Sequence, residues 1–263
     1  MFEVRSWWGH LTLQFVVTLG VIPFVAPLII MIFRSGQGQG FAVNYGAVLG
    51  RPEFPVFLRN SLVIAVGAVV VTYTCTMLAA FALAKLRLKG REIVFYLMVG
   101  ALTLPTAALS VPLFITIRQL GLYDTPWSVI LPIAALQTAF NVLLARGFME
   151  GIPEEILEAA HMDGANSARI FYHIILPLSR PISAVIVVWS FVGAWNEYLL
   201  PLLFLQKIEQ QTVTLLPSYF VGQFASDQTK VFATTVLIAL PTIICYVAFS
   251  RFFERGLIAG ATK

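Results

Sequence analysis

Long apolar stretches separated by short polar segments run along the whole chain. Six of these stretches reach the length of about 20 residues that an α-helix needs to cross a bilayer. They cover Leu11–Phe33, Ser61–Leu83, Ile93–Ile117, Pro126–Ala145, Ile182–Phe204 and Val231–Ser250. Because lipid offers no hydrogen-bond partner to an open strand edge, these stretches must be helices. The pattern predicts an all-α membrane protein with six transmembrane helices in one domain over residues 1–263.

The composition is that of a protein embedded in lipid. Apolar residues make up 59% of the 263 residues and charged residues only 11%, with a mean hydropathy of +0.85. Soluble domains carry about 25% charged residues, so an ordinary soluble enzyme is excluded. Cys75 and Cys245 lie inside apolar stretches and are not spaced as metal ligands.

Basic residues are unevenly distributed between the two sets of loops. If the N-terminus is cytoplasmic, the segments 1–10, 84–92, 146–181 and 251–263 hold eleven Lys and Arg residues, and the outer segments hold six. Cytoplasmic loops carry an excess of basic residues. We therefore expect a multi-pass protein of the cytoplasmic membrane with both termini inside. This explanation of the +4 net charge also makes a nucleic-acid partner unnecessary.

The loop 146–181 is predicted to be structured rather than flexible. Pro153 followed by acidic residues is typical of a helix start, and Gly164 is well placed to end that helix. The apolar face expected on it consists of Ile156, Ala159 and Ala160. Asn166 or Ser167 would cap a second short helix. We expect a compact helix-turn-helix outside the bilayer.

This loop is acidic. Its carboxylates are Glu150, Glu154, Glu155, Glu158 and Asp163. Anionic lipid would repel them, whereas a helix that merely rests on the membrane surface is typically rich in Lys and Trp. A protein partner with a basic or polar groove is therefore favoured over a lipid-surface helix.

The segment from Glu158 to Gly164, followed after nine residues by Ile174–Pro177, resembles the EAA motif of ATP-binding-cassette importer permeases. The resemblance implies a type I importer permease fold in which this motif forms a coupling helix that docks on a cytoplasmic ATPase. The residues that it implies for docking are Glu158, Ala159, Ala160, Asp163, Gly164, Ile174, Leu176 and Pro177.

Further segments resemble the maltose-type, carbohydrate-importing branch of these permeases. They are Gln119–Trp127, Trp195–Tyr198 and Arg255–Ala261. In that branch the C-terminal tail reaches the ATPase interface, which here implies Arg255, Gly256, Leu257 and Gly260. Residues 205–230 resemble the external loop that contacts the solute-binding protein.

The resemblance also implies a set of partners. These are a second homologous permease that differs from this chain, two ATPase subunits and an extracytoplasmic solute-binding protein that delivers a sugar. ATP and Mg would be held by the ATPase subunits, because this chain has no Gly-x-x-x-x-Gly-Lys-Ser/Thr loop. We expect no catalytic residue, metal or cofactor in the chain itself.

A few polar residues inside the predicted helices are candidates for lining the solute route. They are Gln137, Asn141, Ser190, Gly193, Asn196 and Glu197. Glu197 is the only carboxylate within a predicted span, where an unpaired charge would cost about 2.5–3.5 kcal/mol. The alternative is that these side chains only hold neighbouring helices together.

Two other functions remain open at this point. One is a permease of the same superfamily for a non-sugar solute, such as a glycerol phosphodiester or a polyamine. The other is an integral-membrane enzyme that uses Glu197 with His161 or His173. The second is poorly supported, because the histidines lie in the loop and Glu197 lies in a span.

Overall fold

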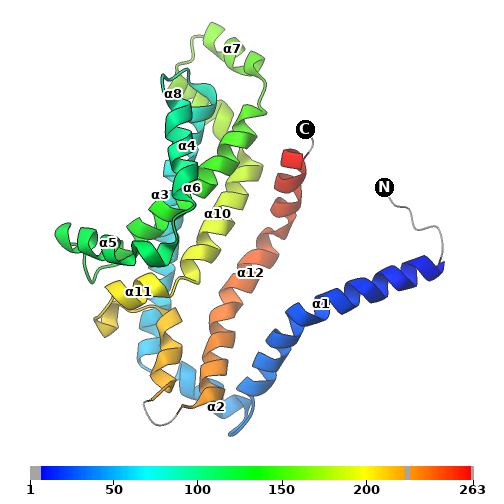
Figure 1. Cartoon of the computed structure of the whole chain (residues 1–263), viewed down its shortest axis with the longest axis vertical. Helices are drawn as coiled ribbons and strands as arrows, with labels where there is room; N and C mark the ends of the chain where they lie inside the picture. Colours follow the sequence, from blue (N-terminus) through cyan, green and yellow to red (C-terminus); the bar gives the residue numbers. More distant parts are fainter. Residues whose placement is uncertain (1–6, 223–225, 262–263) are drawn as a thin grey trace. The chain divides into compact units, whose positions relative to one another are not determined.

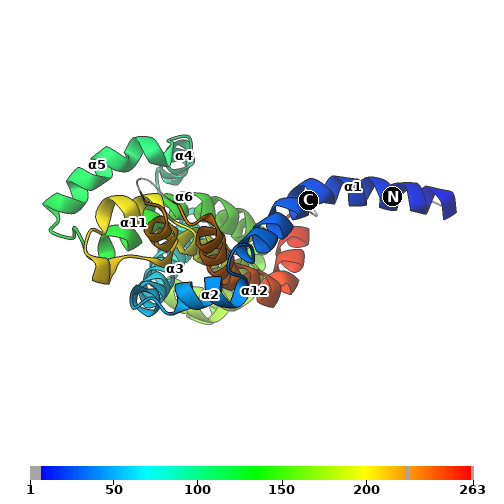
Figure 2. The same ribbon diagram turned by 90° about the horizontal axis from the view of Figure 1, so that it is seen from below.

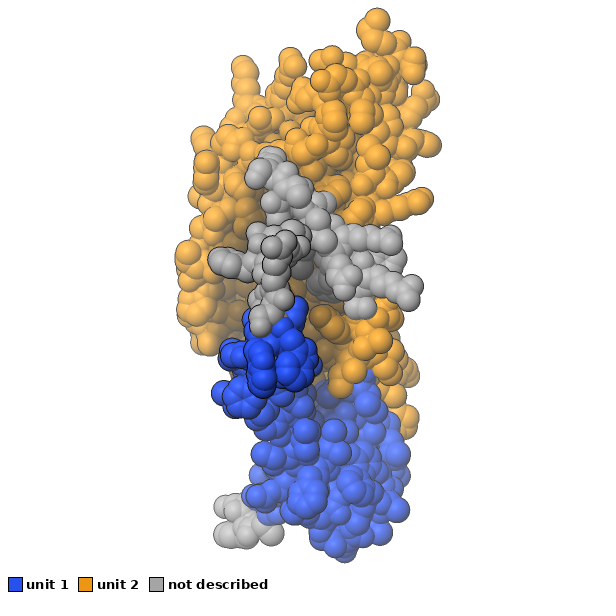
Figure 3. All heavy atoms as spheres, turned by 90° about the vertical axis from the view of Figure 1, so that its right-hand side faces the viewer, with its two compact units in different colours: residues 1–54, 216–240 blue, residues 55–215, 241–263 orange. Residues whose placement is uncertain are grey.

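The computed structural model describes the backbone of residues 7–222 and 226–261 and the side chains up to residue 249. Two compact units make up the chain: Met1–Phe54 with Leu216–Leu240, and Pro55–Leu215 with Pro241–Lys263 (Figure 3). Among the described residues all regular elements are helices, and the β-bridge between Val221 and Ser226 is isolated. The all-α prediction is therefore confirmed.

The first unit contains α1 (Trp7–Ser35), α2 (Phe41–Leu49), most of the 3₁₀ segment η3 (Val213–Phe220) and the start of α12 (Gln228–Ala261). Asn44 joins α2 to the end of α1, because its side-chain amide donates to the carbonyls of Ser35 at 2.9 Å and Gln37 at 2.8 Å. In the same unit the Arg51 guanidinium lies 4.9 Å from the centre of the Phe220 ring.

The second unit contains the remaining elements (Figure 1). They are α3 (Glu53–Lys85), α4 (Arg91–Ala101), α5 (Thr106–Gln119), α6 (Trp127–Glu150), α7 (Glu154–Met162), α8 (Ser167–Ile170), the π-helical segment η1 (Phe171–Ile175), α9 (Leu176–Leu178), α10 (Arg180–Trp195), α11 (Leu199–Phe204) and η2 (Ile208–Gln210). Its core joins side chains of α3, α6, α7, η1 and α10, with Met77, Met149 and Ile186 almost fully buried.

Four described helices, α1, α3, α6 and α12, are long and apolar enough to cross a membrane. Two bent pairs of shorter helices raise this number to as many as six. The stretches predicted over Leu11–Phe33, Ser61–Leu83 and Val231–Ser250 lie within α1, α3 and α12, and the stretch over Pro126–Ala145 lies within α6 except for Pro126, which directly precedes that helix. That residues 1–263 form one permease domain remains a prediction.

The predicted continuous helix over Ile93–Ile117 is wrong. The structure has α4 and α5 instead, bent by 107° at the residues between them. Pro105 explains the break, because proline disfavours helical backbone in the residue before it and donates no amide hydrogen bond. Figure 1 shows α5 lying crosswise to α4, and Figure 2 shows α5 extended sideways.

The predicted continuous helix over Ile182–Phe204 is also wrong. Helix α10 ends at Trp195, and α11 begins only at Leu199. Pro201 has no amide hydrogen, so the carbonyl of Glu197 four residues earlier would lack its helical donor. The hydroxyl of Thr214 supplies that donor at 2.9 Å. Glu197 thus lies in a break between two helices rather than inside a helical span.

Asp124 fastens the turn between α5 and α6 to the segment that follows α11. Its carboxylate accepts the backbone amides of Gln206 at 2.9 Å and Lys207 at 3.1 Å, and its own amide donates to the Phe204 carbonyl at 3.1 Å. Asp124 has a positive φ of 60°, which Asp and Asn tolerate better than most residues. Its side chain is only 11% exposed.

We predict that Asp124→Ala lowers the stability of the purified chain by about 2 kcal/mol, because two backbone amides lose a charged acceptor. Thermal unfolding in detergent measures the loss. Asp124→Asn is the matched control, since Asn keeps both an acceptor oxygen and tolerance of positive φ. Equal melting temperatures for Asp124→Ala and the wild-type chain would contradict this role.

Candidate functional site

Helix α7 starts and ends where local chemistry requires. Pro153 precedes it in an extended conformation, and Glu154 and Glu155 occupy its first turn, at the positive end of the helix dipole. Gly164 ends it with φ +77°. The Gly164 amide donates to the His161 carbonyl at 2.9 Å, which is half of a Schellman turn. The predicted helix start and stop are therefore confirmed.

The chain then turns into a second helical stretch, as predicted. The other half of the Schellman turn is the 2.9 Å bond from the Ala165 amide to the Ala160 carbonyl. Asn166 caps α8, because its side-chain oxygen accepts the Arg169 amide at 2.9 Å. The stretch continues through η1 to Leu178 and meets α10 at a bend of 79°. The loop is thus a defined helix-turn-helix.

Helix α7 has an inner and an outer face. Leu157 and Ala160 are 9% and 8% exposed and belong to the hydrophobic core of the second unit. The outer face consists of the exposed residues Glu158, Ala159, His161, Met162, Asp163 and Gly164. Met162 is 89% exposed. The outer face therefore combines two carboxylates with a small and a flexible apolar side chain.

The expected apolar face of Ile156, Ala159 and Ala160 is wrong. Ile156 and Ala159 are exposed, and only Ala160 points into the core. The residue that accompanies Ala160 there is Leu157, three positions earlier and on the same side of the helix. Ala160 is buried in the core of the second unit, whereas Ala159 lies on the exposed face of the helix, where a partner could contact it.

The second half of the motif lies along η1 and α9. Ile174 and Leu176 are half-buried against the core, while Pro177 is exposed. Ile174 and Leu176 therefore help to hold the loop on the bundle.

Lys85 anchors the beginning of the loop to the end of α3. Its ammonium group donates to the Ile152 carbonyl at 2.6 Å. Leu157 and Ala160, in the helix α7 that follows Ile152, pack into the core of the same unit. Loop and bundle are thus joined by a hydrogen bond and by apolar packing, so a displacement of α7 would be transmitted to α3 and α6.

Four of the proposed route residues form a polar seam between α6 and α10. The amide nitrogen of Asn141 donates to the Ser190 hydroxyl at 3.1 Å, and both side chains are fully buried. A Cβ atom on Gly193 would lie 2.5 Å from the side-chain nitrogen of Gln137, so the glycine makes room for this amide. The side-chain oxygens of Gln137 and Asn141 are buried without a hydrogen-bond donor. The seam therefore contains two side-chain oxygens that could each accept a further hydrogen bond.

Asn196 and Glu197 lie elsewhere, at the break after α10. The Glu197 carboxylate accepts the Leu200 amide at 3.1 Å and so supports the first turn of α11. Asn196 donates to the Val192 carbonyl at 2.8 Å and to the Thr242 hydroxyl at 3.2 Å. The sequence reasoning missed both Thr242 and Thr214, because contacts over such sequence separations leave no local pattern.

The histidines and Glu197 do not come together. His173 precedes α10 and Glu197 follows it, so the 16 residues of that helix, about 24 Å, separate them. In the part of the chain that the structure describes, no three His, Cys, Asp or Glu side chains gather as a possible metal site.

The residues expected in the C-terminal contact, Arg255, Gly256, Leu257 and Gly260, lie beyond the described side chains.

We predict that Ala160→Asp destabilises the chain by about 2–5 kcal/mol, because it buries a charge in an apolar core. The matched variant Ala159→Asp, one position away on the exposed face, should change stability by no more than about 0.5 kcal/mol. Thermal unfolding of both variants in detergent distinguishes the two faces of α7. Similar losses in both would contradict the orientation of the helix.

Three comparisons identify relatives of this chain. Residues 73–259 match the family model described as "Binding-protein-dependent transport system inner membrane component". The lactose transport system permease protein LacG of Rhizobium radiobacter is 31% identical over 253 residues, covering 93% of this chain and 92% of that protein.

Solved structures share the fold. A bacterial ABC transporter that imports the acidic polysaccharide alginate contains a chain with 27% identity and a TM-score of 0.78, covering 96% of this chain and 99% of that one. A structure of a bacterial alginate transporter with a periplasmic protein that holds an alginate pentasaccharide matches with 16% identity and a TM-score of 0.76, over 95% of both chains. The chain is thus a multi-pass membrane protein of the ABC importer permease type, and it belongs to the family of inner-membrane components of binding-protein-dependent transport systems.

Proposed function

We propose that this chain is a transmembrane permease subunit of an ATP-driven importer that moves a sugar, namely a di- or oligosaccharide, across the cytoplasmic membrane. The observation that carries the proposal is the loop helix α7, whose inner face is fixed in the core and whose acidic outer face is left uncovered. The similarity to a lactose permease and to an alginate importer supports a sugar as the solute.

The assembled importer would contain a second, homologous permease, two ATPase subunits and an extracytoplasmic solute-binding protein. ATP and Mg belong to the ATPase subunits, and the chain itself acts as a transporter subunit rather than an enzyme. The binding protein in the second alginate structure supports such a partner. We propose that both termini lie in the cytoplasm, which the distribution of basic residues supports.

The outer face of α7 is proposed to dock on the ATPase through Glu158, Ala159, Asp163 and Gly164. Glu158 would accept hydrogen bonds from a cationic group of the ATPase, and Ala159 would allow close approach. Pro177 extends this surface, and Ile174 and Leu176 support it from behind. Ala160 contributes by anchoring the helix. The C-terminal contact through Arg255, Gly256, Leu257 and Gly260 remains part of the proposal.

Transport then follows from a change between two states of the bundle. Closure of the ATPase dimer would displace α7 together with the helices to which it is fixed, and so change which side of the membrane the route opens to. Such a shift requires that nucleotide and loaded binding protein favour one state over the other.

The polar seam, Gln137, Asn141, Ser190 and Gly193, is proposed to border the route, with Asn196 and Glu197 at one end. The oxygens of Gln137 and Asn141 are buried without a donor in this structure, and they would accept hydrogen bonds from sugar hydroxyl groups where a change of state of the bundle exposes them. In a membrane interior such acceptors are costly unless water, solute or a partner helix supplies a donor.

We predict that Glu158→Lys reduces association with the ATPase subunits at least tenfold, because one charge-assisted contact is worth about 1.5–3 kcal/mol. Co-purification in mild detergent measures the effect. Glu209→Lys, the same change in the segment after α11, is the matched control and should leave association intact. Unchanged association of Glu158→Lys would argue against α7 as the docking element.

We predict that Glu197→Gln keeps the cap on α11, because the Gln side chain still offers an oxygen to the Leu200 amide, yet alters transport. Asn141→Ala removes the seam amide and should act in the same way. Uptake of labelled lactose, a glycerol phosphodiester and a polyamine, with ATPase activity measured in parallel, tests this. If both variants keep the wild-type rate of uptake and the wild-type preference among the three solutes, these residues do not border the route. If the wild-type importer takes up only a non-sugar solute, the proposed solute is wrong.

A further inference from the structure

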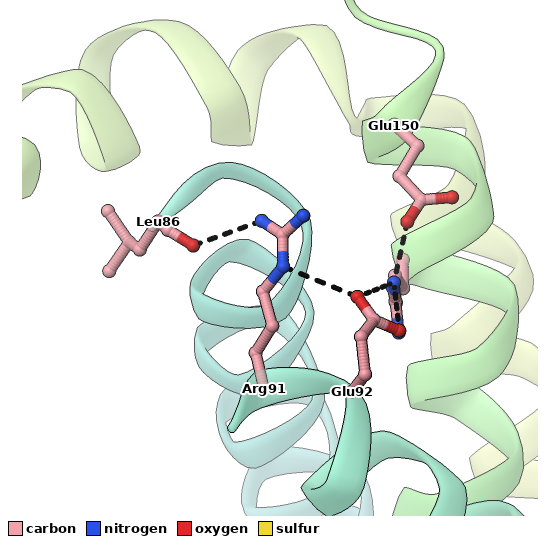
Figure 4. A network of polar contacts seen from close by, with 5 residues as sticks. Leu86, Arg91, Glu92 and Glu150 are labelled. Atoms are coloured by element: carbon pink, nitrogen blue, oxygen red, sulfur yellow. Dashed lines mark hydrogen bonds and ion pairs between the residues drawn. The ribbon is translucent and has the colours of Figure 1, made fainter. Parts of the chain in front are cut away.

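A buried arginine near the end of α6 forms a compact charge network. Arg146 is 8% exposed and is the only buried charged residue among the described side chains. Its guanidinium donates to Glu150 at 2.8 Å and to both oxygens of Glu92, at 2.8 and 2.9 Å. Figure 4 shows the carboxylates of Glu92 and Glu150 converging on one side chain, with Arg91 on the other side of Glu92.

The two carboxylates reach Arg146 from different helices. Glu150 lies one turn further along α6, at i+4, and so pre-orients the guanidinium without joining any other element. Glu92 lies in the first turn of α4, 54 residues earlier in the chain. Phe95, one turn further along α4, has its ring centre 4.0 Å from the guanidinium carbon. The contacts to Glu92 and Phe95 therefore tie α4 to α6.

The apolar packing of α4 against the rest of the unit is sparse. No residue of α4 is buried, and Ile93, Tyr96 and Leu97 are more than half exposed. The guanidinium shares one nitrogen between both oxygens of the half-exposed Glu92 carboxylate, and such a charge-assisted contact is stronger than a neutral hydrogen bond. Arg91 adds a second contact to Glu92, at 3.3 Å. The position of α4 thus depends strongly on this network.

Glu150 is also the last residue of α6, directly before the loop that carries α7. We propose that Arg146 is a positioning residue, and that its link to Glu92 transmits displacement of the α7 loop to α4 and, through the bend, to α5. The inference rests on the proposed docking of α7 and adds a specific connection to it. Helices α4 and α5 correspond to the third predicted membrane crossing, so the link connects the ATPase side to a distant part of the bundle.

Hydrogen exchange measured by mass spectrometry on the assembled importer tests this, in the nucleotide-free state and with ATP, Mg and vanadate. In the wild type we expect nucleotide to change the exchange of both α7 and α4. In Glu92→Ala, α7 should still respond, while α4 should lose its response and exchange about tenfold faster in both states. Glu150→Ala removes a carboxylate from the same arginine without cutting the link, so α4 should still respond.

Three results would overturn the proposal: an α4 response in Glu92→Ala equal to that of the wild type, equal losses in Glu92→Ala and Glu150→Ala, or no α4 response in the wild type. If Glu92→Ala does not assemble, Glu92→Gln keeps one acceptor oxygen and should show a partial loss of the α4 response. The failure of the docking proposal is distinguishable, because α7 of the wild type would then show no change when the ATPase subunits bind.

Discussion

The constraint on which the structure depends is that a backbone carbonyl inside a membrane must find a donor within the protein. Unbroken helices satisfy this rule by themselves, and each break needs an added partner. At the break after α10, Pro201 removes the helical donor of the Glu197 carbonyl, and Thr214 replaces it. The Glu197 carboxylate then starts α11 by accepting an amide. Polar residues that seemed to belong to a solute route thus also carry a structural task.

In the loop between α6 and α10, one face of the first helix, α7, packs into the core and the other face is exposed. Leu157 and Ala160 lie in the core, and Lys85 fastens the start of the loop to α3. The Schellman turn at Gly164 limits the helix to a short, rigid element. A rigid element that is firmly attached on one side can transmit force, whereas a flexible loop would absorb it. The network around Arg146 extends this rigidity to α4.

Much of this could be predicted from the sequence, because the signals are local. The apolar stretches located the long helices, and Pro153, Gly164 and Asn166 correctly marked the ends of the loop helices. The bends after Ala101 and Trp195 were missed, because a proline in a membrane helix can be absorbed as a kink or can break the helix, depending on distant partners such as Thr214. The inner face of α7 could not be predicted from local periodicity, because Ile156 and Leu157 are adjacent and both apolar, and only the fold decides that Leu157 is the one that faces the core. Whether the proposed docking and route residues act as expected is a separate question, since their partners belong to other chains.

Gly193 has an implication for how such a seam can diversify. The atom that a side chain at this position would meet is the terminal nitrogen of Gln137, the mobile end of a long side chain rather than backbone. A methyl group there could be accommodated by rotation of the amide, with α6 and α10 keeping their spacing. In the proposed route, the chemical character of the seam can therefore be altered at Gly193 on an unchanged scaffold, which offers a simple physical way for one architecture to come to carry different cargoes.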